Sequence, residues 1–433
     1  MGKGFWGGVF LPARKRQTQA TLPRTAPQPK FLVFPLRQYD GVLCTAHVQV
    51  GDGVCAGQCI AGGVEGQVPI HASASGRVTA IEPRFHSDGQ MLPSIVIEND
   101  YQYTRSERMY RREGVETLNE NQIRAIVQEA GISGLGGLSF PLPRPEDPPL
   151  DYLLINACEC EPYVTADDSL MCAYPEQVAL GAALIQRMLH PARCIIAIED
   201  NKPQAIAAME GQARELGMEL RVLPTRYPQG SKEQLIQAVT SREIPPGQNA
   251  AAVGCAVYNV ATCASVYKAV YAGEPIMRRI VTVTGGAIQN PCNLIALIGT
   301  PISHLIEAAG GFSQKPYKVV VGGAMMGKSQ PLLDAPILRN NNAVLCLGEE
   351  DRVQQEQSLC LRCGKCLAAC PMHLQPLYFH RYADTKNLQR LRALHPEDCH
   401  ECGCCAYVCP GKLSLVETIR AVKGRLKREG GLA

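Results

Sequence analysis

The chain has 433 residues, of which 46% are hydrophobic and 19% charged, and its net charge is +3 at pH 7. A net charge this close to neutral argues against nucleic acid as a partner. The sequence holds no run of about 18 apolar residues, so we expect no membrane-spanning helix. No apolar stretch follows the first charged residues, so we expect no signal peptide.

Residues 31–105 are predicted to form a β domain, preceded by an extension over residues 1–30. Short β-rich runs alternate with glycine turns, as in VQVGDGVCAGQCI and SGRVTAI. This pattern resembles the lipoyl/biotinyl barrel-sandwich fold. A carrier domain of that type needs a lysine on a hairpin, and no lysine lies between Lys30 and Lys202. We therefore expect a structural or docking module.

Residues 106–275 are predicted to form an α/β domain, because buried strands alternate with segments of helical apolar spacing. The expected strands are 151–157, 193–200 and 218–224, and the expected helices are 174–190 and 202–217. This alternation indicates a mostly parallel sheet with helices on both faces. Ligands of such sheets bind at the carboxyl ends of the strands.

Two loops of this domain are candidate ligand sites. GLGGLSFP spans Gly134 to Pro141, and its glycines let backbone amides approach a phosphate or a flat ring. Such a loop is also typical of an ordinary turn. INACECEPYVTADD spans Ile155 to Asp168 and gathers an amide and several carboxylates directly after a strand. An acidic run is often only solvated surface, but its place after a buried strand favours a ligand site.

The pattern of residues 276–350 predicts a strand, a short helix and a second strand. The segment has about the size of a β-grasp domain. VVGGAMMGKS lies in this region but lacks the G-x4-G-K-[ST] order of a P-loop. We therefore expect no nucleoside triphosphate there. LSLVETIRAVKGRLKREGG, at the end of the chain, is a candidate basic amphipathic helix.

Two cysteine ladders of the pattern C-x2-C-x2-C-x3-C-P lie within residues 351–433. Three thiolates of one ladder bind one 4Fe-4S cluster, and the fourth cysteine binds the cluster of the other ladder. The predicted ligands are Cys360, Cys363, Cys366 and Cys409 for cluster 1, and Cys399, Cys402, Cys405 and Cys370 for cluster 2. Structural zinc is the alternative, but zinc usually takes two separated C-x2-C pairs. Cys404 is an additional thiol, which we interpret as a packing residue.

The order of these motifs resembles the RnfC (RsxC) family, the C subunits of the Rnf electron transport complex. The motifs are GLGG-x-x-FP, INACECEPY-x-TADD, YPQG, GTPISHLIEAAGG, GGAMMG and the two ladders. The central part is also similar to the flavoprotein subunit of respiratory complex I. The resemblance implies a multidomain α/β plus β fold: a barrel-sandwich domain, a Rossmann-type α/β domain, an SLBB-like β-grasp domain and a two-cluster ferredoxin-like α-helical domain.

The resemblance also implies sites for FMN and NADH. The residues that would line FMN are Gly134, Gly136, Gly137, Phe140, Asn156, Glu159 and Asn259, the last on the phosphate side. Glu161 would face the nicotinamide nucleotide. The family's lysine after the glycine-rich loop is missing, and Arg144 is a candidate substitute. The family's N-V-G-T reads N-V-A-T here, and its F-x-G-G-I-H-P reads FWGGVFLP.

The implied function is electron transfer between NADH and iron–sulfur partners through FMN and two 4Fe-4S clusters, coupled by the complex to ion translocation. The implied partners are the iron–sulfur B subunit, the membrane subunits and ferredoxin-type carriers. The chain would lie on the cytoplasmic side of the cell membrane as a peripheral subunit. An electron-relay or cobalamin-reductase-like protein without a functional NADH site is the alternative, motivated by the missing lysine.

Overall fold

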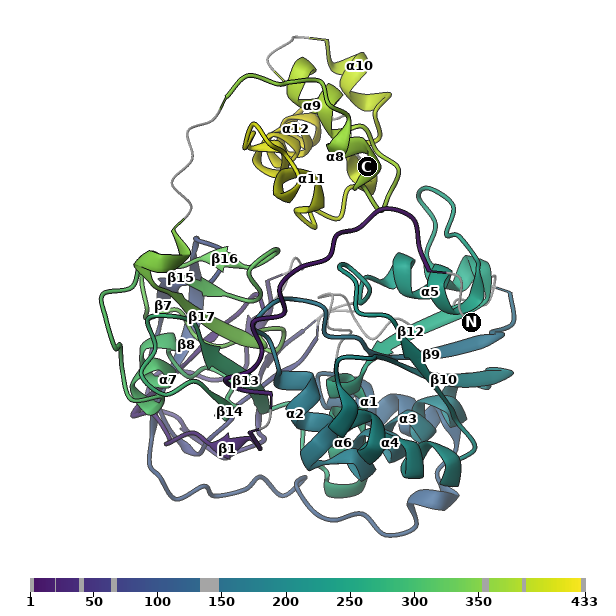
Figure 1. Ribbon diagram of the computed structural model, residues 1–433. Helices are drawn as coiled ribbons and strands as arrows, with labels where there is room; N and C mark the ends of the chain where they lie inside the picture. Colours follow the sequence, from purple (N-terminus) through teal and green to yellow (C-terminus); the bar gives the residue numbers. More distant parts are fainter. Residues whose placement is uncertain are drawn as a thin grey trace.

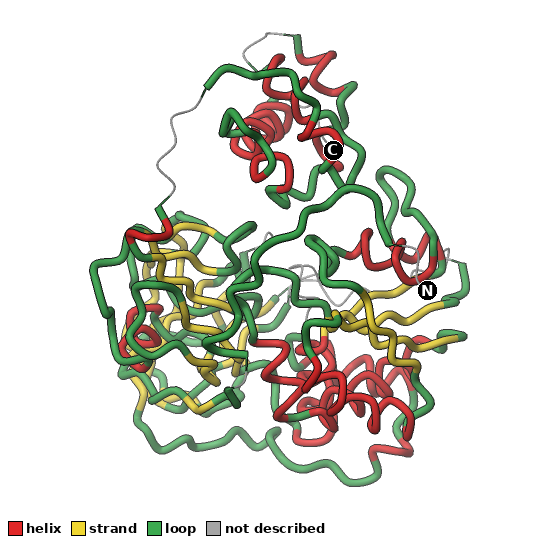
Figure 2. Tube along the Cα trace, viewed as in Figure 1, coloured by secondary structure: helices red, strands yellow, loops and turns green. Residues whose placement is uncertain are grey.

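A computed structural model describes residues 4–19, 21–38, 43–63, 68–132, 148–352, 358–383 and 387–429. A body rich in strands lies beside an α/β body, and a small helical module lies above both (Figures 1 and 2). No helix in these ranges is long and apolar enough to span a membrane.

The barrel domain consists of two small antiparallel sheets. One has the order β2 (Phe31–Pro35), β8 (Met91–Asn99), β7 (Gly76–Phe85), β4 (Gly53–Val54), and the other β3 (Thr45–Ala46), β5 (Cys59–Gly62), β6 (Ile70–His71). Across the first sheet Leu32 is paired with Ile97, and Phe34 with Ile95, and all four are fully buried. Such aromatic and β-branched cross-strand pairs stabilise a sheet with one buried face.

A six-stranded sheet forms the β-grasp region. Its order is β1 (Arg24–Thr25), β14 (Cys292–Leu297), β13 (Arg278–Thr284), β17 (Ala343–Leu347), β15 (Lys318–Val321), β16 (Lys328–Ser329). Helix α7 (Ile302–Ala308) packs against this sheet and buries Ile302, Leu305 and Ile306 in their common apolar core. The short edge strand β1 comes from the N-terminal extension.

The α/β domain has a four-stranded parallel sheet, in the order β11 (Glu219–Leu223), β10 (Arg193–Glu199), β9 (Tyr152–Ala157), β12 (Cys255–Asn259). Helices α1 (Glu120–Glu129), α3 (Pro175–Leu189), α4 (Pro203–Glu215) and α6 (Val260–Ala272) lie on one side of it, and α5 (Lys232–Thr240) on the other (Figure 1). Leu153 and Ile155 pack into the core shared with α3 and α6, whereas Leu154 packs with Leu235 and Ile236 of α5. Burial on both faces explains why these strands are almost continuously apolar.

The helical module contains α8 (Lys365–Ala368), α9 (Pro376–Tyr382), α10 (Leu388–Arg392), α11 (Cys404–Tyr407) and α12 (Leu415–Arg428). Helix α12 is the basic amphipathic helix expected from the sequence. Its apolar face is buried within the module, through Leu415, Val416, Ile419, Val422 and Leu426. The helix therefore closes the module, and the predicted multidomain α/β plus β fold is confirmed.

Candidate functional site

A cleft lies at the carboxyl ends of β9 and β12. The chain runs from β9 to β10 and β11 on one side, while β12 pairs with β9 on the other, so the winding reverses between β9 and β12. Asn156 and Asn259 are register partners at this point. Open α/β sheets bind their ligands at such a reversal. The cleft has a volume of about 1090 Å³, slightly above the roughly 300–1,000 Å³ that is usual for ligand pockets.

The two asparagines fix the loops that form the cleft. Asn156 donates from Nδ2 to the carbonyl of Gly230 over 2.8 Å. Asn259 caps α6, because its Oδ1 accepts from the amide of Ala261 over 2.7 Å, and its Nδ2 donates to Asp167 Oδ2 over 2.6 Å. The side-chain amides thus tie the strand ends to the neighbouring loops that line the cleft.

Glu159 lies on the cleft wall, with its carboxylate at the start of α2 (Ala166–Ala173). Its oxygens accept from the amides of Asp167, over 2.8 Å, and Asp168, over 3.4 Å. Burial raises the pKa of Glu159 to about 7, against the opposing charge of Lys15, whose Nζ is 3.9 Å from Oε2.

Two buried lysines lie behind Glu159. Lys15 donates from Nζ to the carbonyls of Glu159 and Val164, and Lys202 forms a 2.7 Å ion pair with Glu199. Buried lysines need partners of this kind, since an isolated buried charge is very costly. Sequence reasoning missed both. Lys15 is 144 residues from Glu159, so no local pattern connects them.

Glu161 is held by the GGAMMG loop. Its two carboxylate oxygens accept from the amides of Met325 and Met326, each over 3.0 Å. Burial raises its pKa, although these two amides act in the opposite direction. A Cβ on Gly323 would lie 2.2 Å from Cδ of Glu161, so the carboxylate needs the glycine. The loop that looked superficially like a P-loop is therefore a carboxylate-binding turn.

Thr262 and Arg279 are cleft residues that sequence reasoning missed. Thr262 lies in the first turn of α6, is 3% exposed, and its Oγ1 has no hydrogen-bond partner among the described residues. Arg279 reaches the same cleft from β13, with 6% of its surface exposed. A helix N-terminus with a free hydroxyl and a cation nearby attracts an anion such as a phosphate. Thr262 is the last residue of the N-V-A-T motif, and this motif is the sequence feature from which it could have been predicted as a site residue.

The eight ladder cysteines surround two separate cavities in the helical module. Cys360, Cys363, Cys366 and Cys409 line one cavity. Cys370, Cys399, Cys402 and Cys405 line the other, together with Cys404. The fourth cysteine of each ladder thus lies with the first three cysteines of the other ladder.

The two cavities differ in their distance from the cleft. Cys402 and Cys404 pack in one apolar cluster with Tyr227, which also lines the cleft. Close to the other cavity, Leu359 is 88% exposed and Cys363 is also exposed. The Cys370 group therefore lies beside the cleft, and the Cys360 group lies nearer the molecular surface.

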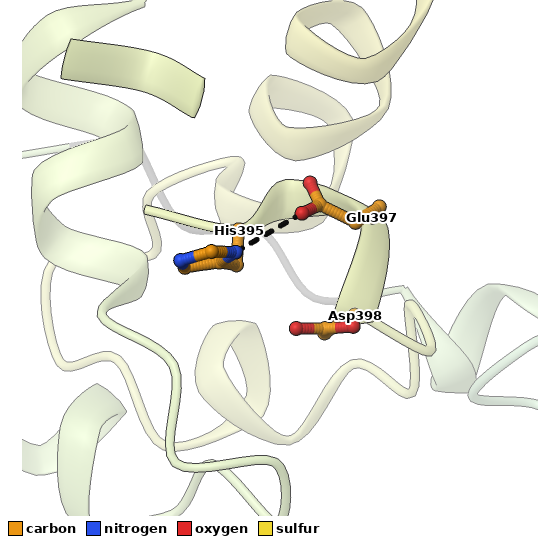
Figure 3. A group of neighbouring side chains, drawn as sticks. All are labelled: His395, Glu397 and Asp398. Atoms are coloured by element: carbon orange, nitrogen blue, oxygen red, sulfur yellow. Dashed lines mark hydrogen bonds and ion pairs between the residues drawn. The ribbon is translucent and has the colours of Figure 1, made fainter. Parts of the chain in front are cut away.

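One further cluster of ligand-type side chains lies in the helical module, at η4 (Pro396–Asp398). His395 Nδ1 is 3.1 Å from Glu397 Oε1, and Asp398 lies nearby (Figure 3). The His395 and Glu397 side chains are both exposed. Exposed pairs of this kind contribute little, and we assign no role to the cluster.

The glycine-rich loop lies outside the described residues. This concerns the predicted site residues Gly134, Gly136, Gly137 and Phe140, and the candidate substitute Arg144. Among the predicted flavin and nucleotide residues, the structure brings Asn156, Glu159, Glu161 and Asn259 together around the cleft.

Known families match nearly the whole chain. Residues 3–102 match the RnfC barrel sandwich hybrid domain, and residues 127–268 match the Nuo51 FMN-binding domain. Residues 280–329 match the SLBB domain, and residues 359–412 match the 4Fe-4S dicluster domain. A relative from Acetobacterium woodii, named as the C subunit of the Na(+)-translocating ferredoxin:NAD(+) oxidoreductase complex, is 38% identical over 97% of this chain and 96% of its own length. The chain belongs to the RnfC family.

Other relatives of this RnfC-family chain carry similar names. In Clostridium ljungdahlii, the C subunit of the proton-translocating ferredoxin:NAD(+) oxidoreductase complex is 39% identical over 87% of this chain and 83% of that protein. In Serratia proteamaculans, the C subunit of the ion-translocating oxidoreductase complex is 38% identical over 90% of this chain, which covers 56% of that longer relative. The predicted family is thereby confirmed.

A solved structure supports the fold. The crystal structure of an NAD+-reducing [NiFe]-hydrogenase in the H2-reduced state aligns with a TM-score of 0.50 at 18% identity, over 76% of this chain and 68% of the hydrogenase chain. At this identity the likeness concerns the fold alone. With the family matches, it confirms the predicted domain types, including an FMN-binding domain and a 4Fe-4S dicluster domain.

Proposed function

We propose that this RnfC-family chain exchanges electrons between NADH and iron–sulfur partners through FMN in the cleft and two 4Fe-4S clusters in the helical module. It would do so as the C subunit of an ion-translocating ferredoxin:NAD(+) oxidoreductase complex, as its relatives are named. The observation that carries the proposal is the position of one complete cysteine set beside a cleft at the sheet's reversal point.

The residues of the cleft fit FMN. The buried hydroxyl of Thr262, the N-terminus of α6 and the guanidinium of Arg279 suit a phosphate group. Asn156 and Glu159 would lie at the flavin ring system, and Asn259 would position the phosphate end through α6. Bound FMN supplies the conversion between two-electron and one-electron transfer. The chain's own part is to orient the two ligands and to exclude water from between them.

Glu161 is the proposed nucleotide-facing residue. Because Met325 and Met326 hold its carboxylate, its position is set before a ligand arrives. A preorganised group of this kind loses little conformational entropy on binding. Glu161 and the GGAMMG loop would therefore shape the nicotinamide side of the cleft together.

The thiols fit two 4Fe-4S clusters, since each cavity is lined by four ladder cysteines. We propose Cys370, Cys399, Cys402 and Cys405 as ligands of the cluster nearer the cleft, and Cys360, Cys363, Cys366 and Cys409 as ligands of the other. The second cluster would lie near the surface, where a partner reaches it. Those partners would be the iron–sulfur B subunit, the membrane subunits and ferredoxin-type carriers, at the cytoplasmic face of the membrane.

An anaerobic NADH titration of the reconstituted protein tests this function. Flavin absorbance near 450 nm and paramagnetic resonance of the clusters would be followed together. Bleaching of the flavin followed by cluster signals is the expected result. Intact clusters and bound flavin that do not respond to NADH would overturn the NADH site and leave an electron relay with another donor.

A further inference from the structure

The N-terminal segment crosses the junction between the α/β domain and the helical module, as the dark purple trace in Figure 1 shows. The amide of Gly8 donates to the carbonyl of Ala369 in the helical module over 2.9 Å. The next residue, Val9, forms an antiparallel bridge with Tyr227 of the α/β domain, with hydrogen bonds of 2.8 and 3.0 Å. Consecutive residues therefore bind opposite sides of the junction.

Two glycines let the segment fit into this junction. Gly7 and Gly8 both have φ of +72°, in the left-handed region that favours glycine. A Cβ on Gly7 would lie 2.7 Å from the carbonyl oxygen of Cys370, and a Cβ on Gly8 would lie 2.5 Å from that of Tyr227. The first glycine thus abuts a proposed cluster ligand, and the second abuts the cleft wall.

Side chains on either side anchor the same segment. The guanidinium of Arg226 lies 4.8 Å from the ring centre of Phe5 and 5.6 Å from that of Phe10. It also donates to the carbonyls of Phe5 and Gly7. Trp6 stacks on His373 of the helical module, with ring centres 6.0 Å apart and planes inclined by 19°.

The junction beneath the segment connects the cleft to the Cys370 group. Tyr227 is buried, lines the cleft, and donates from Oη to the carbonyl of Cys402 over 2.8 Å. Val9 and Ala369 complete the apolar cluster around this contact. Helix α5 adds two polar contacts, from Gln234 to the carbonyl of Pro371 and from Glu233 to His400.

We propose that residues 5–10 form a clamp that sets the spacing between the cleft and the Cys370 group, with Gly7 and Gly8 as positioning residues. The inference rests on the proposed function and adds to it the element that holds donor and acceptor sites at a fixed separation. Electron transfer slows steeply as two centres move apart, and a site held about 1 Å too loosely loses much of its activity. The clamp accounts for the FWGG motif, which the ligand sites leave unexplained.

The substitutions Gly7→Ala and Gly8→Ala test the clamp in the cluster-loaded holoprotein. Gly4→Ala is the matched control, because a Cβ there would lie 3.9 Å from its nearest neighbour. Gly51→Ala controls for backbone strain alone, since Gly51 has φ of +100° but nothing within 4 Å of a Cβ. Trp6 is the only tryptophan in the chain, so its emission reports on the clamp directly.

A released clamp moves Trp6 away from His373 and from the strongly absorbing cluster. We expect Gly7→Ala and Gly8→Ala to give at least twofold brighter emission, and the controls to match the wild type. In stopped-flow experiments with NADH, we expect the flavin reduction rate and the KM for NADH to stay within twofold. Electron arrival at the clusters should slow at least tenfold.

Wild-type emission together with wild-type cluster reduction in both glycine variants would overturn the clamp. If those variants lose iron, the substitution Arg226→Leu tests the clamp instead, because it removes the hydrogen bonds to Phe5 and Gly7 without backbone strain. Brighter Trp6 emission in this variant would support the clamp. Emission and electron transfer equal to those of the wild type would overturn it. If NADH fails to reduce the wild-type flavin, the proposed function fails. The emission data still decide whether the segment is a clamp.

Discussion

At the scale of single residues, burial determines the chemistry of Glu159 and Glu161. Each carboxylate leaves water and accepts two backbone amides in exchange. Amide donors favour the charged form, whereas burial favours the neutral form. Burial is the larger effect in both, so both pKa values are raised. Burial also governs the effect of the Thr262 hydroxyl on stability and the pKa of His71.

Glu161→Gln should raise the KM for NADH about tenfold, equivalent to about 1.4 kcal/mol. The new amide group would face the amides of Met325 and Met326 as a donor, so one hydrogen bond is lost and the loop loosens. Steady-state kinetics with iron quantification measure this, and the iron content should not change. Glu210→Gln, at an exposed pair with Arg214, is the control. Unaltered kinetics in Glu161→Gln would remove the residue from the nucleotide site.

Thr262→Val should change FMN affinity and stability in opposite directions. The hydroxyl is buried without a partner, so replacing it with a methyl group should leave the FMN-free protein equally or more stable. If Oγ1 binds the flavin phosphate, the Kd for FMN should rise about tenfold, or about 1.4 kcal/mol. Flavin fluorescence and thermal unfolding measure the two effects. Ser265→Ala, one turn along α6, is the control, since its hydroxyl already donates to Ala261. An unchanged Kd would exclude Thr262 from the phosphate site.

His71 should make stability depend on acid pH. Burial, followed by the charges of Arg339 and Arg108, lowers its pKa to about 3. Below the unfolded pKa of about 6.5 the unfolded chain binds a proton that the folded chain does not, so stability falls as pH falls from 6.5 toward 3. The contribution of His71 should decrease by about 2 kcal/mol between pH 7 and pH 5. Urea unfolding at both values should show a smaller decrease in His71→Gln, and equal decreases would contradict the assignment.

At the scale of elements, the packing of α3 against α6 positions the cleft. A Cβ on Gly181 of α3 would lie 1.8 Å from the carbonyl oxygen of Cys263 in α6. The backbones can approach this closely only because the residue is glycine. Since Asn259 caps α6 and Thr262 lies in its first turn, this contact sets the position of the proposed phosphate site.

Gly181→Ala should destabilise the protein by about 1–3 kcal/mol or more, because the helices must separate. It should also weaken FMN binding, since α6 moves. Gly211 of α4 offers the opposite case, as nothing lies within 4 Å of a Cβ there. Gly211→Ala should stabilise by up to about 1 kcal/mol through helix propensity. Denaturant unfolding of both variants measures the difference, and similar effects of the two would show that the close helix contact is unimportant.

At the scale of the whole molecule, the arrangement of the domains gives the two cysteine sets different positions relative to the cleft. Contacts through Tyr227, Met325 and the N-terminal clamp place the Cys370 group beside the cleft. The Cys360 group lies toward exposed Leu359. Electrons leaving the cleft would therefore reach the Cys370 group first.

Cys370→Ala and Cys409→Ala should have unequal effects. Cys370→Ala should damage the cluster nearer the cleft and prevent NADH from reducing the remaining one. Cys409→Ala should damage the outer cluster and leave NADH reduction of the inner cluster intact. Iron content and paramagnetic resonance after NADH and after dithionite distinguish the two. The reverse pattern would show that the proposed ligand sets or their order is wrong.

The cluster motifs and the parallel α/β sheet could be predicted from the amino-acid sequence. These features depend on short-range patterns, namely cysteine spacing and apolar periodicity. Only the packing of the folded chain shows that Met325 holds Glu161 across 164 residues, that Lys15 lies behind Glu159, and that Gly8 and Val9 bind two different domains. Such contacts depend on how separately folded elements pack, and no local pattern in the chain encodes which distant backbone amide or carbonyl a side chain will meet.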